Sequence, residues 1–69
     1  MTYEEPNVKD RMQYSVAKTA SVLEIDRTTV YRHIRKGKLL ANIIRANGRT
    51  VISGANIKRF WHKEMLDTI

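Results

Sequence analysis

The sequence predicts a small α+β domain, mainly helical, in which two short helices precede a β-hairpin and a third helix. Three observations predict it: two helical apolar repeats that each follow an N-cap residue, an Asn-Gly pair between β-prone runs, and a final apolar stripe of helical period. At 69 residues, folding buries only about 60% of the unfolded chain's surface. We expect one modest core and no enclosed catalytic chamber.

The first helix is expected to begin after Ser15, because serine is a favourable N-cap residue. Val16, Ala20 and Leu23 follow at helical spacing and would form the buried face. Thr19 is expected on the opposite, polar face. This pattern predicts a helix of about two turns.

The second helix is expected to begin at Arg27, with Asp26 as its N-cap. The Asp26 carboxylate can accept hydrogen bonds from free amides of the first turn, and its charge favours the positive end of the helix dipole. Val30 and Ile34 lie four residues apart and are expected to face the core. Gly37 stands where a left-handed residue usually ends a helix.

The pair Asn47-Gly48 is the clearest turn signal in the chain. The flanking runs, residues 43–46 and 49–52, are rich in β-branched side chains and predict a hairpin. A two-residue turn would pair Ile43 with Ile52, and we expect that pair to face the core.

The third helix is expected to be capped by Ser53 or Asn56. Its apolar stripe consists of Ile57, Phe60, Trp61 and Met65. We interpret the aromatic pair Phe60-Trp61 as core rather than as a platform for stacking bases, because so small a domain has few other large side chains.

The predicted domain covers residues 14–66. Residues 1–13 are expected to form a flexible tail, since the first ten are acidic and Pro6 and Asn7 interrupt any regular pattern. Residues 67–69 are expected to be a short C-terminal tail.

The positive charge of the chain is concentrated in one segment. The formal net charge is +6, and residues 27–59 contain no acid but hold Arg27, Arg32, Arg35, Lys36, Lys38, Arg45, Arg49, Lys58 and Arg59. This distribution favours a polyanionic partner. Cysteine is absent, which excludes disulfides and thiolate chemistry, and no apolar run approaches the roughly 20 residues of a membrane span.

The sequence offers little support for an enzyme, and we expect no catalytic residue, metal or cofactor. His33 and His62 show no metal-ligand spacing with a carboxylate. A tyrosine nucleophile such as Tyr31 would need a basic constellation on a larger scaffold. The three glycines are isolated, so no phosphate-binding loop is formed, and we interpret each as a turn residue.

Two short helices joined by a few residues have the layout of a helix-turn-helix, whose second helix enters the DNA major groove. With Val30 and Ile34 buried, the outward residues of the second helix are Arg27, Thr28, Thr29, Arg32, Arg35 and Lys36. Arginine can form bidentate bonds to guanine, and threonine can contact a thymine methyl group. A merely solvated helix face usually mixes acids with bases, whereas this one has no acid after Asp26.

Residues 14–23, 26–39 and 57–61, with a strand pair between them, resemble the excisionase/MerR-like winged helix-turn-helix family. The resemblance covers about residues 14–63, and residues 29–37 are its most specific part. It implies that the second helix reads the major groove and that the hairpin is a wing on the minor groove or backbone. The implied wing and flanking contacts are Tyr31, Lys38, Arg45, Asn47 and Arg49.

The chain departs from the family at Glu24, where a turn glycine is common, and at Ser53, where proline often opens the last helix. Its hairpin is also longer than usual. Because the sequence ends at Ile69 without a dimerising helix or effector domain, we expect a stand-alone domain. Such domains resemble recombination directionality factors of phages and integrative elements, which bind tandem sites, bend DNA and help recruit the integrase.

That resemblance implies double-stranded DNA and an integrase or recombinase as partners. It also implies a monomer in solution that assembles cooperatively on DNA, in the cytoplasm of a bacterial host. The last helix and tail would contact the protein partner through Trp61, His62, Lys63, Glu64 and Asp67, although capping of the core followed by fraying explains this segment equally well.

Two other functions remain open. A small transcriptional repressor, or a DNA-packaging or transfer accessory protein, could use the same helix and wing. An RNA-binding or protein-interaction module could also carry an incidental basic face.

Overall fold

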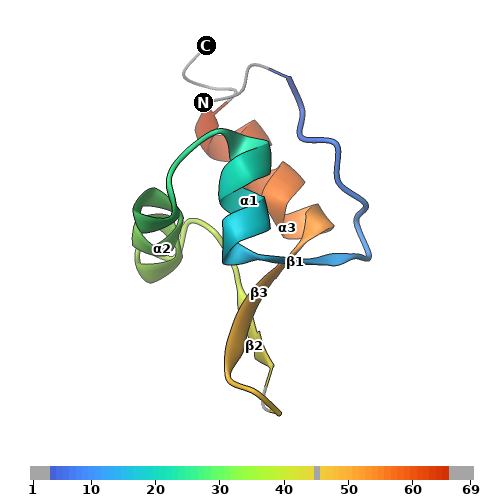
Figure 1. The fold of residues 1–69 in the computed structure, drawn as a ribbon. Coiled ribbons are helices and arrows are strands. Elements are labelled where there is room, and N and C mark those ends of the chain that lie inside the picture. The colour runs from blue at the N-terminus through green and yellow to red at the C-terminus, as the bar shows by residue number, and fades with distance from the viewer. Residues whose placement is uncertain (1–3, 45, 66–69) are drawn as a thin grey trace.

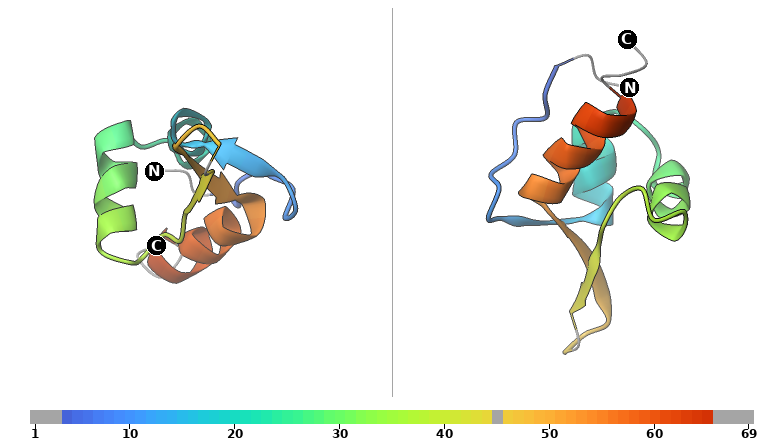
Figure 2. Two further views of the ribbon diagram at one scale, coloured as in Figure 1. Left: turned by 90° about the horizontal axis from the view of Figure 1, so that it is seen from below. Right: turned by 180° about the vertical axis from the view of Figure 1, so that it is seen from behind.

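The computed structural model describes residues 4–44 and 46–65. The elements run β1 (Gln13–Ser15), α1 (Val16–Leu23), α2 (Arg27–Arg35), β2 (Asn42–Ile44), β3 (Arg49–Ser53), α3 (Gly54–Phe60) and a π-helical turn, η1 (Trp61–Met65). The helices gather at one end, and the β2–β3 hairpin extends away from them as a wing (Figures 1 and 2). This is a small α+β winged helix-turn-helix, as the sequence predicts.

The N-terminal caps of α1 and α2 are the predicted ones. The Ser15 hydroxyl accepts a hydrogen bond from the backbone N–H of Lys18 at 3.1 Å. The Asp26 carboxylate accepts one from the backbone N–H of Thr29 at 2.7 Å. These side-chain acceptors satisfy amides that have no partner within their helix, so the sequence fixes where both helices begin.

The predicted glycine also ends α2. Gly37 has a φ of +74°, and its N–H donates to the Ile34 carbonyl at 3.1 Å. The next amide, that of Lys38, reaches back to the His33 carbonyl at 3.0 Å. A left-handed glycine with two backward hydrogen bonds stops a helix without side-chain strain.

Glu24 ends α1 in the left-handed region, with a φ of +57°. This conformation costs a residue with a Cβ roughly 1–2 kcal/mol. We expect Glu24→Gly to raise the free energy of unfolding by about 1 kcal/mol, since glycine adopts this φ freely. Urea denaturation measures the change. Ser21→Gly, on the exposed side of α1, is the control and should lower stability; an equal loss in both variants would contradict the explanation.

The sheet has one strand more than the sequence predicts. Its strand order is β1-β3-β2, and β1 pairs antiparallel with β3, so that Tyr14 lies opposite Ile52. Strand β1 leads directly into α1 and ties the start of the helix-turn-helix to the base of the wing (Figure 1).

The expectation of a flexible tail over residues 1–13 is wrong for the described part, residues 4–13. Val8 is buried at 5% exposure, the Met12 carbonyl accepts from the Gly54 N–H at 2.9 Å, and Asp10 forms an ion pair with Lys58 at 2.9 Å. Hydrogen bonding to Asp10 raises the pKa of Lys58. The buried Val8 side chain, a backbone hydrogen bond and an ion pair therefore hold residues 4–13 against the domain.

The predicted register of the hairpin is also wrong. Ile43 lies opposite Thr50, and Ile44 opposite Arg49, so four positions rather than two connect the strands. Gly48, at a φ of +67°, donates its N–H to the Ile44 carbonyl at 2.7 Å and closes this wider loop. The wider loop moves Ile43 two positions towards the tip, where it is 70% exposed.

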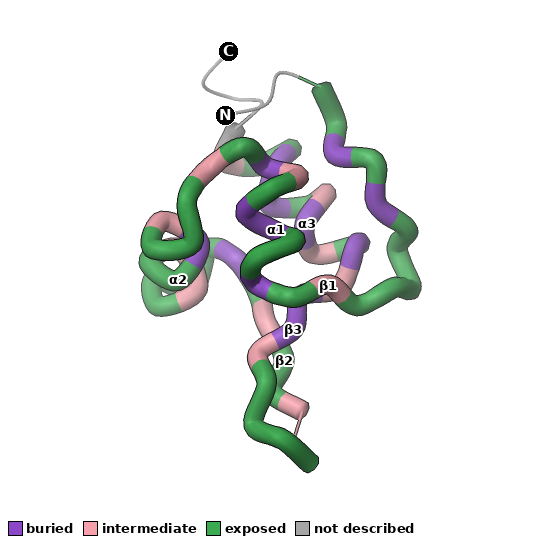
Figure 3. The backbone as a smooth tube through the Cα atoms, in the orientation of Figure 1, coloured by how far each residue is buried: buried purple, intermediate pink, exposed green. Residues whose placement is uncertain are grey.

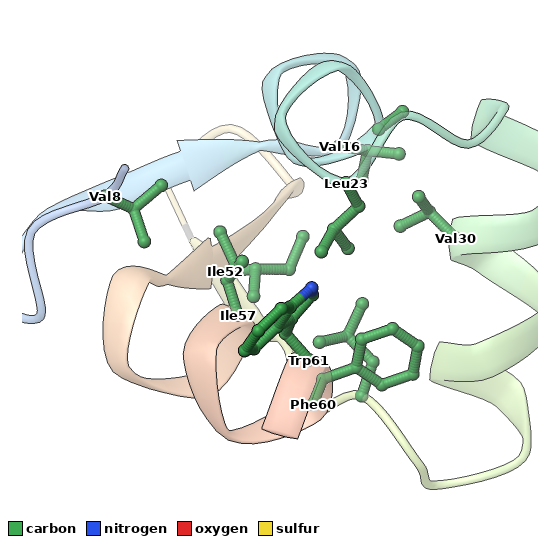
Figure 4. Close-up of a cluster of buried hydrophobic side chains, with 10 residues drawn as sticks. Val8, Val16, Leu23, Val30, Ile52, Ile57, Phe60 and Trp61 are labelled. Carbon is green, nitrogen blue, oxygen red and sulfur yellow. The ribbon is translucent and has the colours of Figure 1, made fainter. Parts of the chain in front are cut away.

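The core forms where α1, α2, α3 and the base of the sheet meet (Figure 4). Phe60 and Trp61 belong to it, at 2% and 5% exposure, as the sequence predicts. Thr19 does not lie on a polar face as expected. It is fully buried, and its hydroxyl donates to the Ser15 carbonyl at 2.9 Å, which satisfies the polar group inside the helix.

The third helix, α3, begins where expected. The Ser53 hydroxyl accepts from the Asn56 N–H at 3.2 Å, so Ser53 rather than Asn56 is the cap. Neither α3 nor any other helix in residues 4–44 and 46–65 is long and apolar enough to cross a membrane.

Candidate nucleic-acid interface

Helix α2 turns a cationic surface outwards. Val30 is the one fully buried residue of α2, and the other residues of the helix are exposed or half-buried (Figure 3). The exposed members of the predicted DNA-reading set are Arg27, Thr28, Arg32, Arg35 and Lys36. Thr29 is half-buried and contributes its backbone N–H to the Asp26 cap, so it lies at the edge of this face.

Two hollows divide the outward residues of α2 between them. The first, which we call the outer hollow, is lined by Thr28, Arg32, Arg35 and Lys36. The second, the wing groove, lies between the start of α1, one side of α2 and the hairpin, and its polar lining includes Gln13, Ser15, Arg27, Tyr31, Asn47 and Arg49. The predicted recognition residues therefore face two different spaces.

The ion pairs of the described residues do not involve the arginines that line the two hollows. Three basic side chains are paired with carboxylates: Lys38 with Glu64 at 3.6 Å, Lys58 with Asp10 at 2.9 Å, and His62 with Glu5. Among the described residues, no carboxylate forms an ion pair with the arginines of α2 or with Arg49. The positive charge beside both hollows is thus available to an external polyanion.

Asp26 lies at the N-terminal end of this surface, and its negative charge caps α2. Hydrogen bonds from the side chain and the backbone of Thr29 lower the pKa of the Asp26 carboxyl. The carboxylate therefore stays ionised at the N-terminus of α2, where it caps the helix. Arg35 and Lys36 lie at the opposite end of the helix.

The wing carries two of its predicted contact residues at its tip. The Asn47 side-chain oxygen accepts from the Arg49 N–H at 3.0 Å, and both residues are exposed. Arg45, predicted beside them, lies outside the described residues. Tyr31 is 44% exposed in the wing groove, whereas Lys38 is held by Glu64 and lines neither hollow.

The expected protein-contact surface at the end of the chain is only partly available. Trp61 cannot be a surface contact, because its apolar ring is packed in the core at 5% exposure. His62 and Lys63 are exposed, and Glu64 is half-buried. Asp67 lies outside the described residues.

Sequence reasoning missed the part of the wing groove that comes from β1 and the start of α1. Gln13 and Ala17 line the groove, and so does Ser15, which also caps α1. None of these side chains is charged, so no feature of composition marks them. Only the strand pairing of β1 with β3, which the sequence did not predict, places them there.

His33 lies on the inner side of α2, where its ring packs on Phe60 with centroids 4.8 Å apart. Its Nδ1 is buried without a hydrogen-bond partner among the described residues. Burial, and then the charge of Lys38, lowers the pKa of His33. The ring therefore acts as a neutral packing group, and no three His, Asp or Glu side chains of the described chain gather as a metal site requires.

The depressed pKa of His33 predicts a loss of stability in mild acid. The unfolded chain binds this proton at a pH near 6.5, whereas the folded protein resists it. Neutral His33 therefore contributes its full stabilisation of the folded state above about pH 6.5, and this stabilisation is lost as the pH falls through the folded-state pKa. We expect the free energy of unfolding of the wild type to fall more steeply below pH 6.5 than that of His33→Leu, measured by urea denaturation at each pH. Identical slopes for wild type and His33→Leu would contradict this assignment.

With the fold and the two hollows established, comparison with known families identifies the domain. Residues 14–65 match the model of the helix-turn-helix domain family. The chain belongs to this family. Comparisons with curated proteins and with solved structures each found no match. This helix-turn-helix protein is a sequence-specific DNA-binding domain.

Proposed function

We propose that this helix-turn-helix protein is an architectural DNA-binding protein, an excisionase or recombination directionality factor of a phage or integrative element, acting in the cytoplasm of a bacterial host. Helix α2 enters the major groove and presents Arg27, Thr28, Thr29, Arg32, Arg35 and Lys36. The wing, with Arg45, Asn47 and Arg49, lies on the adjacent minor groove or backbone. The observation that carries the proposal is the cationic face of α2, which has no acid after Asp26 and whose arginines form no ion pair with any carboxylate that the structure describes.

The proposed mechanism is architectural because one domain of this size covers little DNA. Single modules bury on the order of 600–1,000 Å² of protein surface, so tight specific binding needs cooperating neighbours. The protein would be a monomer in solution, and copies on tandem sites would contact one another head to tail. Such a series of contacts need not close, and it can bend the DNA that it follows.

The integrase contact is assigned to the end of the chain remote from the wing. His62, Lys63 and Glu64 in η1 and Asp67 beyond it are the polar groups proposed to meet the partner. The exposure of His62 and Lys63 supports this placement, and both side chains lie outside the two hollows proposed for DNA.

Selection of bound sequences from a random DNA duplex library, at a stated salt concentration, tests the proposal. Tandem copies of a short motif are expected, because head-to-tail assembly requires direct repeats. Inverted copies would instead indicate a dimeric repressor, which could use the same α2 face. Absence of any enriched sequence, or a preference for duplex RNA, would overturn the proposal, since the narrow major groove of RNA excludes a helix.

Arg32 is expected to read a base. Its side chain lies in the outer hollow, one turn into α2 and away from the wing. Arg32→Ala should cost about 1–3 kcal/mol of binding free energy at one base-pair position and relax the preference there. Repeating the library selection with the variant measures this directly. Arg59→Ala removes an exposed arginine from α3 and should leave the motif unchanged; an unchanged motif in Arg32→Ala would exclude Arg32 from base reading.

A further inference from the structure

The segment before β1, residues 4–12, lies on the side of the domain away from α2 (Figures 1 and 2). We call it the N-terminal strap. The family match covers residues 14–65 and does not include it, and it lines neither hollow. We propose that the strap fixes the orientation of the wing and so controls how the hairpin meets DNA. The inference rests on the proposed function, because it requires the wing to lie on DNA.

The orientation of the wing depends on its base. Strands β2 and β3 extend beyond the core as a two-stranded ribbon (Figure 1), on which Ile43 and Arg49 are exposed. A two-stranded hairpin is only marginally stable by itself in water. The direction of the wing is therefore set where β3 leaves the body of the domain, between the buried Ile52 and the first turn of α3.

Strand β3 runs directly into α3, because Ser53 is both the last residue of β3 and the N-cap of α3. The first amides of a helix have no partner within it, and two of these amides bind the strap. Gly54 donates its N–H to the Met12 carbonyl at 2.9 Å. Ala55 donates its N–H to the Asp10 carbonyl at 3.2 Å. The strap is thus hydrogen-bonded to the two residues that directly follow the wing in the chain.

The strap also bonds to β1, the neighbour of β3 in the sheet. The Lys9 N–H donates to the Tyr14 hydroxyl at 2.9 Å, and Tyr14 lies opposite Ile52 of β3. A turn before β1 is closed by the Met12 N–H, which donates to the Lys9 carbonyl at 3.1 Å. The strap therefore holds both β1 and α3, the two elements that flank the base of the wing.

Buried side chains anchor the strap to the core. Pro6 and Val8 are buried, and Val8 belongs to the apolar cluster that also includes Trp61 (Figure 4). Two ion pairs join the strap to α3 and η1, but pairs between exposed side chains contribute little to stability. Truncation of Val8 is therefore the substitution expected to loosen the strap.

A wing of fixed orientation meets DNA at a lower entropic cost than a free one. Ordering a flexible segment on binding costs free energy, and an element that is already ordered avoids this cost. With the strap docked, the wing is held at one angle to α2, and both elements can bind together. With the strap released, the wing keeps its side chains but samples many angles, so the contact made by Arg49 contributes less affinity.

The first test measures the coupling between strap and wing. The wild type, Arg49→Ala, Val8→Ala and the double variant are titrated with a duplex that carries the motif selected by the wild type, at temperatures where melting curves show each to be folded. In the wild-type background, Arg49→Ala should weaken binding severalfold and lower the slope of log affinity against log salt concentration by about one. In the Val8→Ala background it should weaken binding by less than about twofold, whereas independent effects would add.

Two further backgrounds control for stability. Val22→Ala makes the same substitution at a half-buried position of α1, and there Arg49→Ala should keep its full effect. A chain without residues 2–9 removes most of the strap but keeps all of the family match, residues 14–65. In that chain, the effect of Arg49→Ala should be at least as small as in Val8→Ala.

A measurement on the unbound protein separates orientation from stability. The chain has no cysteine, so spin labels can be attached at Ser21→Cys in α1 and Ile43→Cys in β2, which are exposed positions. The distance between the labels reports how the wing lies relative to the helices. We expect one narrow distance distribution with the intact strap and a broader one in Val8→Ala. Val22→Ala should keep the narrow distribution.

The outcomes distinguish failure of the strap inference from failure of the proposed function. An undiminished effect of Arg49→Ala in both strap variants, or a label distance that broadens in neither, would overturn the inference while the wing contact stands. No effect of Arg49→Ala in the wild-type background would instead reject the wing contact of the proposed function. The label distance would still decide whether the strap orients the wing.

Discussion

Phe60→Ala is expected to cost about 3–5 kcal/mol of folding free energy, which is comparable to the whole stability of a small domain. The ring is 2% exposed and belongs to the core cluster that joins α3 to the other elements (Figure 4). Its contact with His33 also supports α2 from the inner side. We therefore expect loss of the cooperative thermal transition, and with it loss of DNA binding.

The measurement is circular dichroism during heating and urea titration, with chemical-shift dispersion as a second sign of folding. Phe60→Leu keeps an apolar side chain at the site and should retain a cooperative transition at lower temperature. A wild-type melting temperature in Phe60→Ala would show that the contact between His33 and Phe60 does not hold the helix-turn-helix together.

The parts of the fold that the sequence predicts are those decided over a few neighbouring residues. Ser15, Asp26 and Ser53 each present an oxygen to an amide three residues later. Gly37 ends α2 for an equally local reason, because no side chain obstructs its positive φ. Each of these caps depends only on hydrogen bonds within one helix turn, so residue type and spacing are enough to locate it.

The parts that the sequence misses depend on residues far apart in the chain. Strand β1 exists because Gln13–Ser15 pairs with β3, and Val8 is buried by elements that follow it in the sequence. The predicted register of the hairpin is wrong for a different reason. The pair Asn47-Gly48 predicts a turn, but it does not distinguish a two-residue from a four-residue connection. A shift of two positions preserves side-chain alternation, so the apolar pattern could not correct it.

The candidate site divides in the same way. The charge of α2 and its outward residues follow from helical period, and the structure exposes most of that set. The partition between outer hollow and wing groove does not follow from the helix, because it depends on where the hairpin and β1 lie. For Trp61, two predictions conflicted. Its spacing from Ile57 predicts a core position, whereas the family resemblance suggested a contact with a protein partner. Trp61 is buried, so the core prediction is the correct one.

Gly54→Ala is the second substitution expected to have a large effect. The sequence interpretation of this glycine as a turn residue is wrong, since it opens α3 and its φ is not left-handed. A Cβ at this position would lie 2.0 Å from the Lys9 carbonyl oxygen and 2.6 Å from its carbon. Atoms cannot approach so closely, so the segment before β1 would have to move off α3.

Alanine at the start of an exposed helix normally stabilises it relative to glycine. Here the clash is with backbone rather than with a flexible side chain, so we expect a loss of at least about 1–3 kcal/mol. We also expect faster trypsin cleavage after Lys9 and Arg11, because the hydrogen bond from Gly54 to Met12 would be broken as the segment lifts. Urea denaturation and timed proteolysis measure the two effects separately.

Gly37→Ala is the matched control, because no atom beyond its chain neighbours lies within 4 Å of a Cβ there and only its φ of +74° opposes the substitution. That variant should lose stability by about 1 kcal/mol without faster cleavage near residue 9. Accelerated cleavage confined to Gly54→Ala would show that close backbone contact holds the N-terminal segment. Equal cleavage in both variants, or a more stable Gly54→Ala, would show that the segment is held by Val8 and the Asp10–Lys58 ion pair instead.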